Sequence, residues 1–182
     1  MIWRSVEGER FVRGLQGEDI PLIETQRNTY GQSKVLAPKY RPAPMATRVG
    51  RWLVERAAAR MRRDGYCAGR ISIHIGLWKR HGHHWQQTLN PSQDTRDFLD
   101  IFDALTAQFT NSRTQATSIG INLTNLVLLS ERNGELFLPL APGQNSKRET
   151  LSATIDHINL RYGKTVIKYG EQQEHFGFFD RG

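Results

Sequence analysis

Hydrophobic and polar residues alternate strictly along residues 70–78, RISIHIGLW. One side of this stretch carries Ile71, Ile73, Ile75 and Leu77, and the other carries Arg70, Ser72, His74, Gly76 and Trp78. A two-residue period is typical of a β-strand that buries one side and exposes the other. Residues 116–128 repeat the pattern, with Ile119, Ile121 and Leu123 inward and Ser118, Gly120, Asn122 and Thr124 outward. We therefore predict two strands whose outward sides are polar.

Helical periodicity and chain breakers divide the other segments. Apolar residues at helical spacing predict a short N-terminal helix within residues 1–24 and helices over residues 45–63, 94–109 and 151–162. Further strands are expected at residues 25–36, at HWQQTL after a turn at residues 80–83, and at residues 165–169, with breaks at Asn90-Pro91-Ser92 and over residues 130–150. The expected fold is α+β: a four-stranded β-α-β-β-α-β sheet with two helices on one face, plus a C-terminal helix and a short strand.

The net charge of the chain indicates the kind of partner that it binds. A net charge of +7 and an isoelectric point of about 9.9 favour a polyanion such as nucleic acid, although a basic surface without a partner is the alternative. No apolar run approaches the roughly 20 residues that a membrane span needs. The first ten residues lack the apolar centre of a signal peptide. We expect a cytoplasmic protein without membrane contact.

The outward polar side chains suit a sugar-phosphate backbone. They are Arg70, Ser72 and His74 on one strand and Ser118, Asn122 and Thr124 on the other, to which the first strand adds Arg27, Thr29, and Ser33 or Lys34 depending on register. Small hydroxyl groups let phosphates come close to the main chain, and arginines supply charge. A solvated face rich in Ser and Thr for strand propensity is the alternative. RNA-recognition modules share this element order, but they stack bases on aromatic residues, and here only Trp78 lies outward.

Two further groups of side chains raise the question of catalysis or metal binding. His81, His83 and His84 gather in the expected hairpin turn, and imidazoles at this spacing can hold zinc or nickel. No carboxylate or cysteine lies in the same turn, which favours a polar loop near DNA. Cys67 is the single cysteine, and no base is arranged beside it. We interpret it as a buried structural thiol.

Two charged helix faces have an ordinary and a functional interpretation. Asp97, Asp100 and Asp103 follow one another at intervals of three residues on a predicted helix. We interpret them as a solvated face that pairs with the basic helix 45–63. The arginines of that helix form either a second phosphate contact or a solvated outer face.

Several motifs occur in a recognisable order: IETQRNTYGQSKVLAP, ERAAARMRRDGY, ISIHIGL, PSQDT and SIGINLTNLV. In this order they resemble the little-finger domain of Y-family translesion DNA polymerases, and most closely the bacterial branch described as nucleotidyltransferase/DNA polymerases of DNA repair. LSATIDHINLRYGKTVIKYG is similar to the helix-and-strand tail of that branch, and GERFVRGLQGEDIPLIE to the end of its thumb and the tether that follows.

The resemblance implies a sheet that docks into the major groove of primer-template DNA. It divides the chain into the end of the thumb and tether (1–24), the little finger (25–129) and a C-terminal extension (130–182). It matches QRNTYGQS to the strand that lies along the phosphate backbone, which points to Arg27, Thr29 and Ser33. The metal-binding carboxylates of the polymerase palm have no match here. We therefore expect no catalysis by this chain alone and no cofactor in it, since Mg²⁺ would belong to the palm of the parent polymerase.

A sliding-clamp peptide is a second candidate feature. Residues 173–179 place Gln173 before Phe176 and Phe178, in loose agreement with such a peptide, and GELFLPL at 134–140 is a rival site without the glutamine. Packing of these apolar residues on the domain is the alternative. An adaptor that binds the sliding clamp or other repair proteins is thus the alternative function, and an RNA-binding domain is a third.

Overall fold

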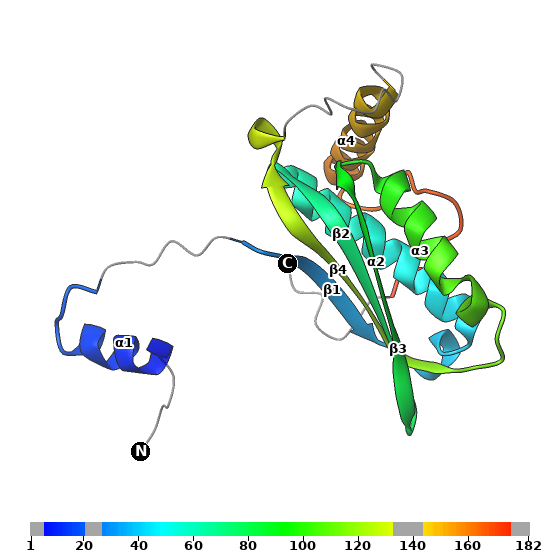
Figure 1. The fold of residues 1–182 in the computed structure, drawn as a ribbon, viewed down its shortest axis with the longest axis horizontal. Coiled ribbons are helices and arrows are strands. Elements are labelled where there is room, and N and C mark those ends of the chain that lie inside the picture. The colour runs from blue at the N-terminus through cyan, green and yellow to red at the C-terminus, as the bar shows by residue number, and fades with distance from the viewer. Residues whose placement is uncertain (1–5, 21–26, 133–143, 176–182) are drawn as a thin grey trace.

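The computed structural model describes residues 6–20, 27–132 and 144–175 (Figure 1). Its elements, in chain order, are α1 (Val6–Leu15), β1 (Tyr30–Val35), η1 (Pro38–Tyr40), α2 (Ala43–Arg63), β2 (Tyr66–Leu77), β3 (Arg80–Ser92), α3 (Thr95–Thr110), β4 (Ala116–Leu128), η2 (Leu129–Glu131) and α4 (Gln144–Tyr162). From β1 to β4 the strands and α-helices follow the order β-α-β-β-α-β. This confirms the predicted α+β fold.

The four strands form one antiparallel sheet in the order β1-β4-β2-β3. Helices α2 and α3 pack on the same face of this sheet, as Figure 1 shows. The inward side chains of the two central strands are fully buried beneath them: Ile71, Ile73 and Ile75 of β2, and Ile119, Ile121 and Leu123 of β4. The strict alternation of the sequence therefore separates a helix-covered face from an uncovered one.

Local sequence signals set where the two covering helices begin and end. Helix α2 has Pro44 in its first turn and ends at Arg63, two residues before Gly65, whose φ of 77° lies in the left-handed region that glycine tolerates. Helix α3 begins after Asp94, whose side chain accepts a hydrogen bond from the backbone N–H of Arg96 at 2.9 Å. This is the capping interaction that satisfies a free N–H of the first turn.

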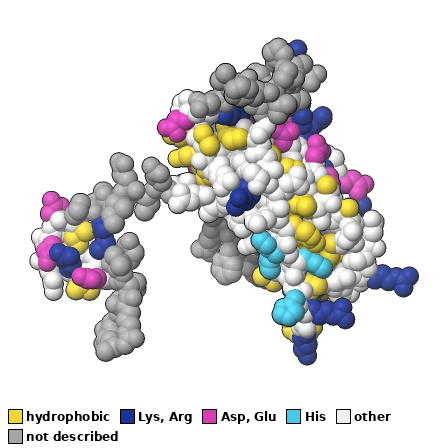
Figure 2. All heavy atoms as spheres, in the orientation of Figure 1, with side chains coloured by type: hydrophobic (Ala, Val, Ile, Leu, Met, Phe, Trp, Pro, Cys, Tyr) yellow, Lys and Arg dark blue, Asp and Glu magenta, His cyan; other side chains and the backbone are white. Residues whose placement is uncertain are grey.

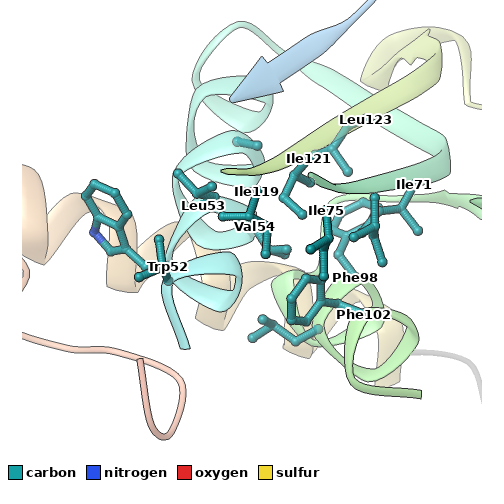
Figure 3. Packing of buried hydrophobic residues seen from close by; sticks show 14 of the residues in the cluster. Trp52, Leu53, Val54, Ile71, Ile75, Phe98, Phe102, Ile119, Ile121 and Leu123 are labelled. Atoms are coloured by element: carbon teal, nitrogen blue, oxygen red, sulfur yellow. The ribbon is translucent and has the colours of Figure 1, made fainter. Parts of the chain in front are cut away.

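A glycine lets α2 approach both α3 and the sheet. A Cβ atom placed on Gly50 would lie 2.4 Å from Cζ of Phe102 and 2.6 Å from Cδ1 of Ile119, which is too close for van der Waals contact. Figure 3 shows Phe98 and Phe102 in one cluster with the isoleucines of β2 and β4. The core thus lies between the sheet and the two helices, and the Phe102 ring is fully buried in it.

Helix α4 is attached to this core mainly by charged groups. Arg62 donates to both carboxylate oxygens of Asp156 at 2.7 and 3.0 Å, and Arg132 donates to both oxygens of Glu149 at 2.5 and 2.9 Å. Such two-pronged pairs hold a fixed orientation as well as a charge. Ile155 is the buried hydrophobic residue of α4. Hydrophobic periodicity alone therefore underestimates how firmly this helix is held.

The structure corrects the sequence prediction in three segments. Residues 144–150 belong to α4, not to a loop, and residues 90–92 continue β3, where Ser92 pairs with Ala68 across an irregularity in the register. Pro91 is tolerated because β3 is an edge strand. Residues 165–169 form no strand. The side chain of Asn159 instead bonds the backbone of Val166 and Ile167 at 2.7 to 2.9 Å and takes the place of a neighbouring strand.

Two smaller expectations also meet the structure. Cys67 is buried, as predicted, and its Sγ lies 3.7 Å from Nη1 of Arg132. Helix α1 forms within the predicted short N-terminal helix and exposes Phe11, Val12 and Leu15. Among the residues described, no helix combines the length and the apolar character needed to cross a lipid bilayer.

Candidate nucleic-acid interface

The uncovered face of the sheet consists of four cross-strand rows, which we call the open face. In the strand order β1, β4, β2, β3, two complete rows are Gly31–Asn122–Ser72–Gln86 and Ser33–Gly120–His74–His84. A third row, Val35–Ser118–Gly76, has no residue from β3. A fourth row, Thr124–Arg70–Thr88, has no residue from β1. The register of the sheet therefore brings together outward residues that are far apart in the sequence, such as Gly31 and Asn122.

The open face is polar, free of acidic residues and only modestly charged. Apart from the exposed Val35 and three glycines, its rows hold hydroxyl, amide and imidazole groups together with the guanidinium of Arg70, and they contain no aspartate or glutamate. His74, His84 and Asn122 are exposed, and Arg70 is half-buried. In Figure 2 the acidic side chains lie toward the margins of this view rather than over the centre of the sheet. No carboxylate of the described residues forms a salt bridge with Arg70. Its guanidinium is therefore available to bind an anion by donating hydrogen bonds.

A glycine makes room for an amide side chain on the open face. A Cβ atom on Gly31 would lie 2.4 Å from Oδ1 of Asn122, so the asparagine side chain occupies the space above the glycine. Gly31, Gly76 and Gly120 add no side chain to the face, so phosphate and sugar groups can approach the backbone there.

Most of the residues predicted to contact DNA do meet on this face. Seven of them lie in its rows: Ser33, Arg70, Ser72, His74, Ser118, Asn122 and Thr124. Thr29 is exposed just before β1 begins, in the same alternation as Gly31 and Ser33. The tertiary structure thus assembles the set that periodicity had proposed, with two exceptions.

Lys34 and Arg27 are the exceptions, because both have partners away from the open face. Lys34 opposes the inward residue Ile119, and its Nζ lies 6.0 Å from the centre of the Trp52 ring. Of the two registers left open by the sequence, the structure has the one that turns Ser33 outward. Arg27 forms a salt bridge with Asp64 and lies 5.2 Å from the centre of the Tyr30 ring. A hydrogen bond from Tyr30, together with the charge of Arg27, holds the pKa of Asp64 below its usual range.

Strand β3 contributes three open-face residues that were not predicted: His84, Gln86 and Thr88. Their alternation with the inward, partly buried Trp85 and Leu89 was visible in HWQQTL. The expected histidine turn is in fact strand. His83 points to the other face, where its ring stacks on Trp85 at 5.0 Å and lies 5.8 Å from the ring of Phe109. Strand alternation therefore separates His83 from His84. Within the described ranges, no three metal-ligating side chains come together.

The acidic helix face differs from its predicted role at one end. Asp103 pairs with Arg51 of α2, which agrees with the predicted pairing, and Asp100 is exposed. Asp97 is not simply solvated, since it accepts a hydrogen bond from Oγ of Ser92 at 2.6 Å and forms a salt bridge with Arg148 at 3.1 Å. Burial raises the pKa of Asp97. These carboxylates therefore connect α3 with its neighbours.

The possible clamp peptide lies largely beyond the described part of the chain. Phe176, Phe178 and GELFLPL at 134–140 are outside the described residues. Gln173 is described, and its backbone N–H donates to the carbonyl of Arg48 at 3.1 Å while its side-chain amide donates to the carbonyl of Glu174 at 3.0 Å. The glutamine is thus packed along α2.

Comparison with known proteins places this geometry in a family. Residues 27–136 match the model of the impB/mucB/samB family C-terminal domain. The comparison with curated proteins gave no match. The matched region runs from just before β1 to just beyond η2, so it contains every strand of the sheet and both helices that cover it. The chain therefore belongs to the impB/mucB/samB family of C-terminal domains, which are the little-finger domains of Y-family DNA polymerases.

Proposed function

We propose that this chain is the non-catalytic duplex-DNA-binding domain of a translesion DNA polymerase that acts in DNA repair. Its open face would lie in the major groove of the primer-template duplex and hold the phosphate backbone. Residues 25–129 would form this little finger, residues 1–24 the end of the thumb and the tether, and residues 130–182 an extension. Nucleotide transfer would belong to the palm of the parent polymerase.

The observation that carries the proposal is a mostly polar open face that includes Arg70 and lacks carboxylates. None of its four rows contains an aspartate or glutamate that would repel a phosphate. The rows contain no phenylalanine, tyrosine or tryptophan, and His74 and His84 are their only aromatic side chains, which favours a duplex over single-stranded RNA. The net charge of +7 would add long-range attraction.

Arg70→Gln is expected to weaken duplex binding about tenfold, which corresponds to roughly 1.4 kcal/mol for the loss of one charged hydrogen bond. Because one phosphate contact is lost, the slope of log K against log salt should become shallower by about 0.9. Fluorescence anisotropy with a primer-template duplex over a salt series measures both quantities. Arg161→Gln, an exposed arginine on α4, is the matched control.

The salt series also tests the proposal as a whole. Wild-type binding should weaken steeply with salt and show no dependence on sequence, because phosphate contacts carry no sequence information. Affinity that stays constant from low to moderate salt would contradict the proposed function. So would a preference for single-stranded RNA over the duplex in a competition assay.

A further inference from the structure

A second basic surface lies on the helix side of the β1 edge, away from the open face. We call it the basic stripe and define it by Arg27, Lys34, Arg56, Arg60 and Arg63. Positions 56, 60 and 63 follow the spacing that places residues on one face of a helix, here the face of α2 beside β1. Five cations from three segments of the chain thus come together along one edge of the sheet.

Short distances between the members of the stripe and a shared set of residues show that they form one surface. Arg56 lies 4.9 Å and Lys34 6.0 Å from the centre of the same Trp52 ring. Arg60 donates to the carbonyl of Gly31, on edge strand β1, at 2.6 Å. Three of the five cations, Arg56, Lys34 and Arg60, are therefore held against the Trp52 ring or strand β1, which fixes the position of the stripe relative to the open face.

Among the described residues, the carboxylate that pairs with the arginines of the stripe is Asp64. It forms a salt bridge with Arg27 and a longer one with Arg63 at 3.5 Å. Within the described ranges, one carboxylate faces the four arginines of the stripe, which leaves most of their positive charge uncompensated. Burial and then the charges of Arg56, Arg27 and Arg63 lower the pKa of Arg60, and Nε of Arg60 is buried without a hydrogen-bond partner. The arginines therefore repel one another, and in the described part of the chain only Asp64 offsets this repulsion.

We propose that the basic stripe is a second phosphate-binding surface, which binds the sugar-phosphate backbone of nucleic acid that passes around the β1 edge. The inference rests on the proposed function, since one DNA molecule would contact both surfaces. Strand β1 joins them, because Ser33 faces the open side and Lys34 faces the stripe. A surface with an excess of guanidinium groups is complementary to phosphates, which arginine binds with charge-assisted hydrogen bonds.

The double variant Arg56→Gln/Arg63→Gln tests this surface with little effect on packing, because both side chains are exposed. A primer-template duplex long enough to extend beyond the sheet is titrated over a salt series. Two lost phosphate contacts should make the slope of log K against log salt shallower by about 1.8 for duplex DNA, or about 1.4 if the contacted backbone is single-stranded. Arg96→Gln/Arg161→Gln removes two exposed arginines elsewhere and should leave the slope unchanged. Urea unfolding of each variant checks that the fold is intact.

The outcomes separate this inference from the proposed function. If Arg70→Gln reduces the slope and the stripe variant keeps the wild-type slope and affinity, the stripe does not bind phosphate and the open face does. If the stripe variant reduces the slope and Arg70→Gln does not, the stripe stands and the open-face proposal fails. A wild-type protein with no salt-dependent binding contradicts both. Equal loss in the stripe variant and in Arg96→Gln/Arg161→Gln would show a general charge effect and contradict the stripe.

Discussion

Phe102→Ala is expected to lower the free energy of unfolding by about 3–5 kcal/mol, the usual cost of removing a fully buried phenylalanine ring. The loss combines the transfer free energy of the ring with the cavity that it leaves between α2, α3 and β4. Most single domains are stable by only about 5–15 kcal/mol, so this one change would remove a large share of the total. Urea unfolding followed by circular dichroism measures the effect.

Gly50 offers a test that separates packing from other consequences of losing the ring. Gly50→Ala alone should destabilise the protein by about 1–3 kcal/mol, because the new Cβ overlaps the Phe102 ring and Ile119. In the Phe102→Ala background the added methyl group enters the cavity, so its cost should fall by about 0.5–3 kcal/mol. If the effects of the two substitutions on the free energy of unfolding are strictly additive, the close contact between Gly50 and Phe102 is contradicted.

Glu55→Gln is expected to stabilise the protein above neutral pH and to remove part of its pH dependence. Burial raises the pKa of Glu55 to about 7, although the backbone N–H of Tyr169 donates to its Oε1 at 3.0 Å and favours the charged form. The folded protein therefore binds a proton that the unfolded chain releases. The stability from this proton is fully present below the ordinary glutamate pKa and is lost as the pH rises through about 7.

The size of this effect follows from the difference between the two pKa values. Between about pH 5 and about pH 8 the wild type should lose about 2–3 kcal/mol more stability than Glu55→Gln. A glutamine side chain keeps an acceptor for Tyr169 and carries no charge. Urea unfolding at both pH values measures the difference. Glu171→Gln, whose carboxylate pairs with Arg48 on the surface, is the matched control and should follow the wild type. Parallel pH profiles for Glu55→Gln and wild type would contradict the raised pKa.

The alternating strands were the most predictable part of the fold and of the candidate interface. The outward position of Ser72 and Asn122 follows from the two-residue period of a strand, which depends only on local backbone geometry. Burial of Ile73 and Ile121 on the opposite side then fixes the register, because a slip by one residue would expose both. The same period would have assigned His84, Gln86 and Thr88 to the open face once β3 was taken to begin at Arg80.

The remaining assignments depended on contacts between distant segments. Arg27 leaves the predicted interface because Asp64, thirty-seven residues away, lies within reach of its guanidinium. Helix α4 is held by Arg62 and Arg132, whose partners no periodicity identifies. Residues 165–169 satisfy their backbone groups on Asn159 and so need no neighbouring strand.

The sequence by itself determined the element order from β1 to β4, the two faces of the central strands and the positive charge of the chain, because each depends on local geometry or composition. Only the tertiary structure decided that Ser33 rather than Lys34 faces outward, that Arg27 pairs with Asp64, and that a row of arginines gathers beside β1. The physical reason is that side-chain direction along a strand is a local property. The partner of a charged side chain depends instead on which distant segment the packed core brings within a few ångströms.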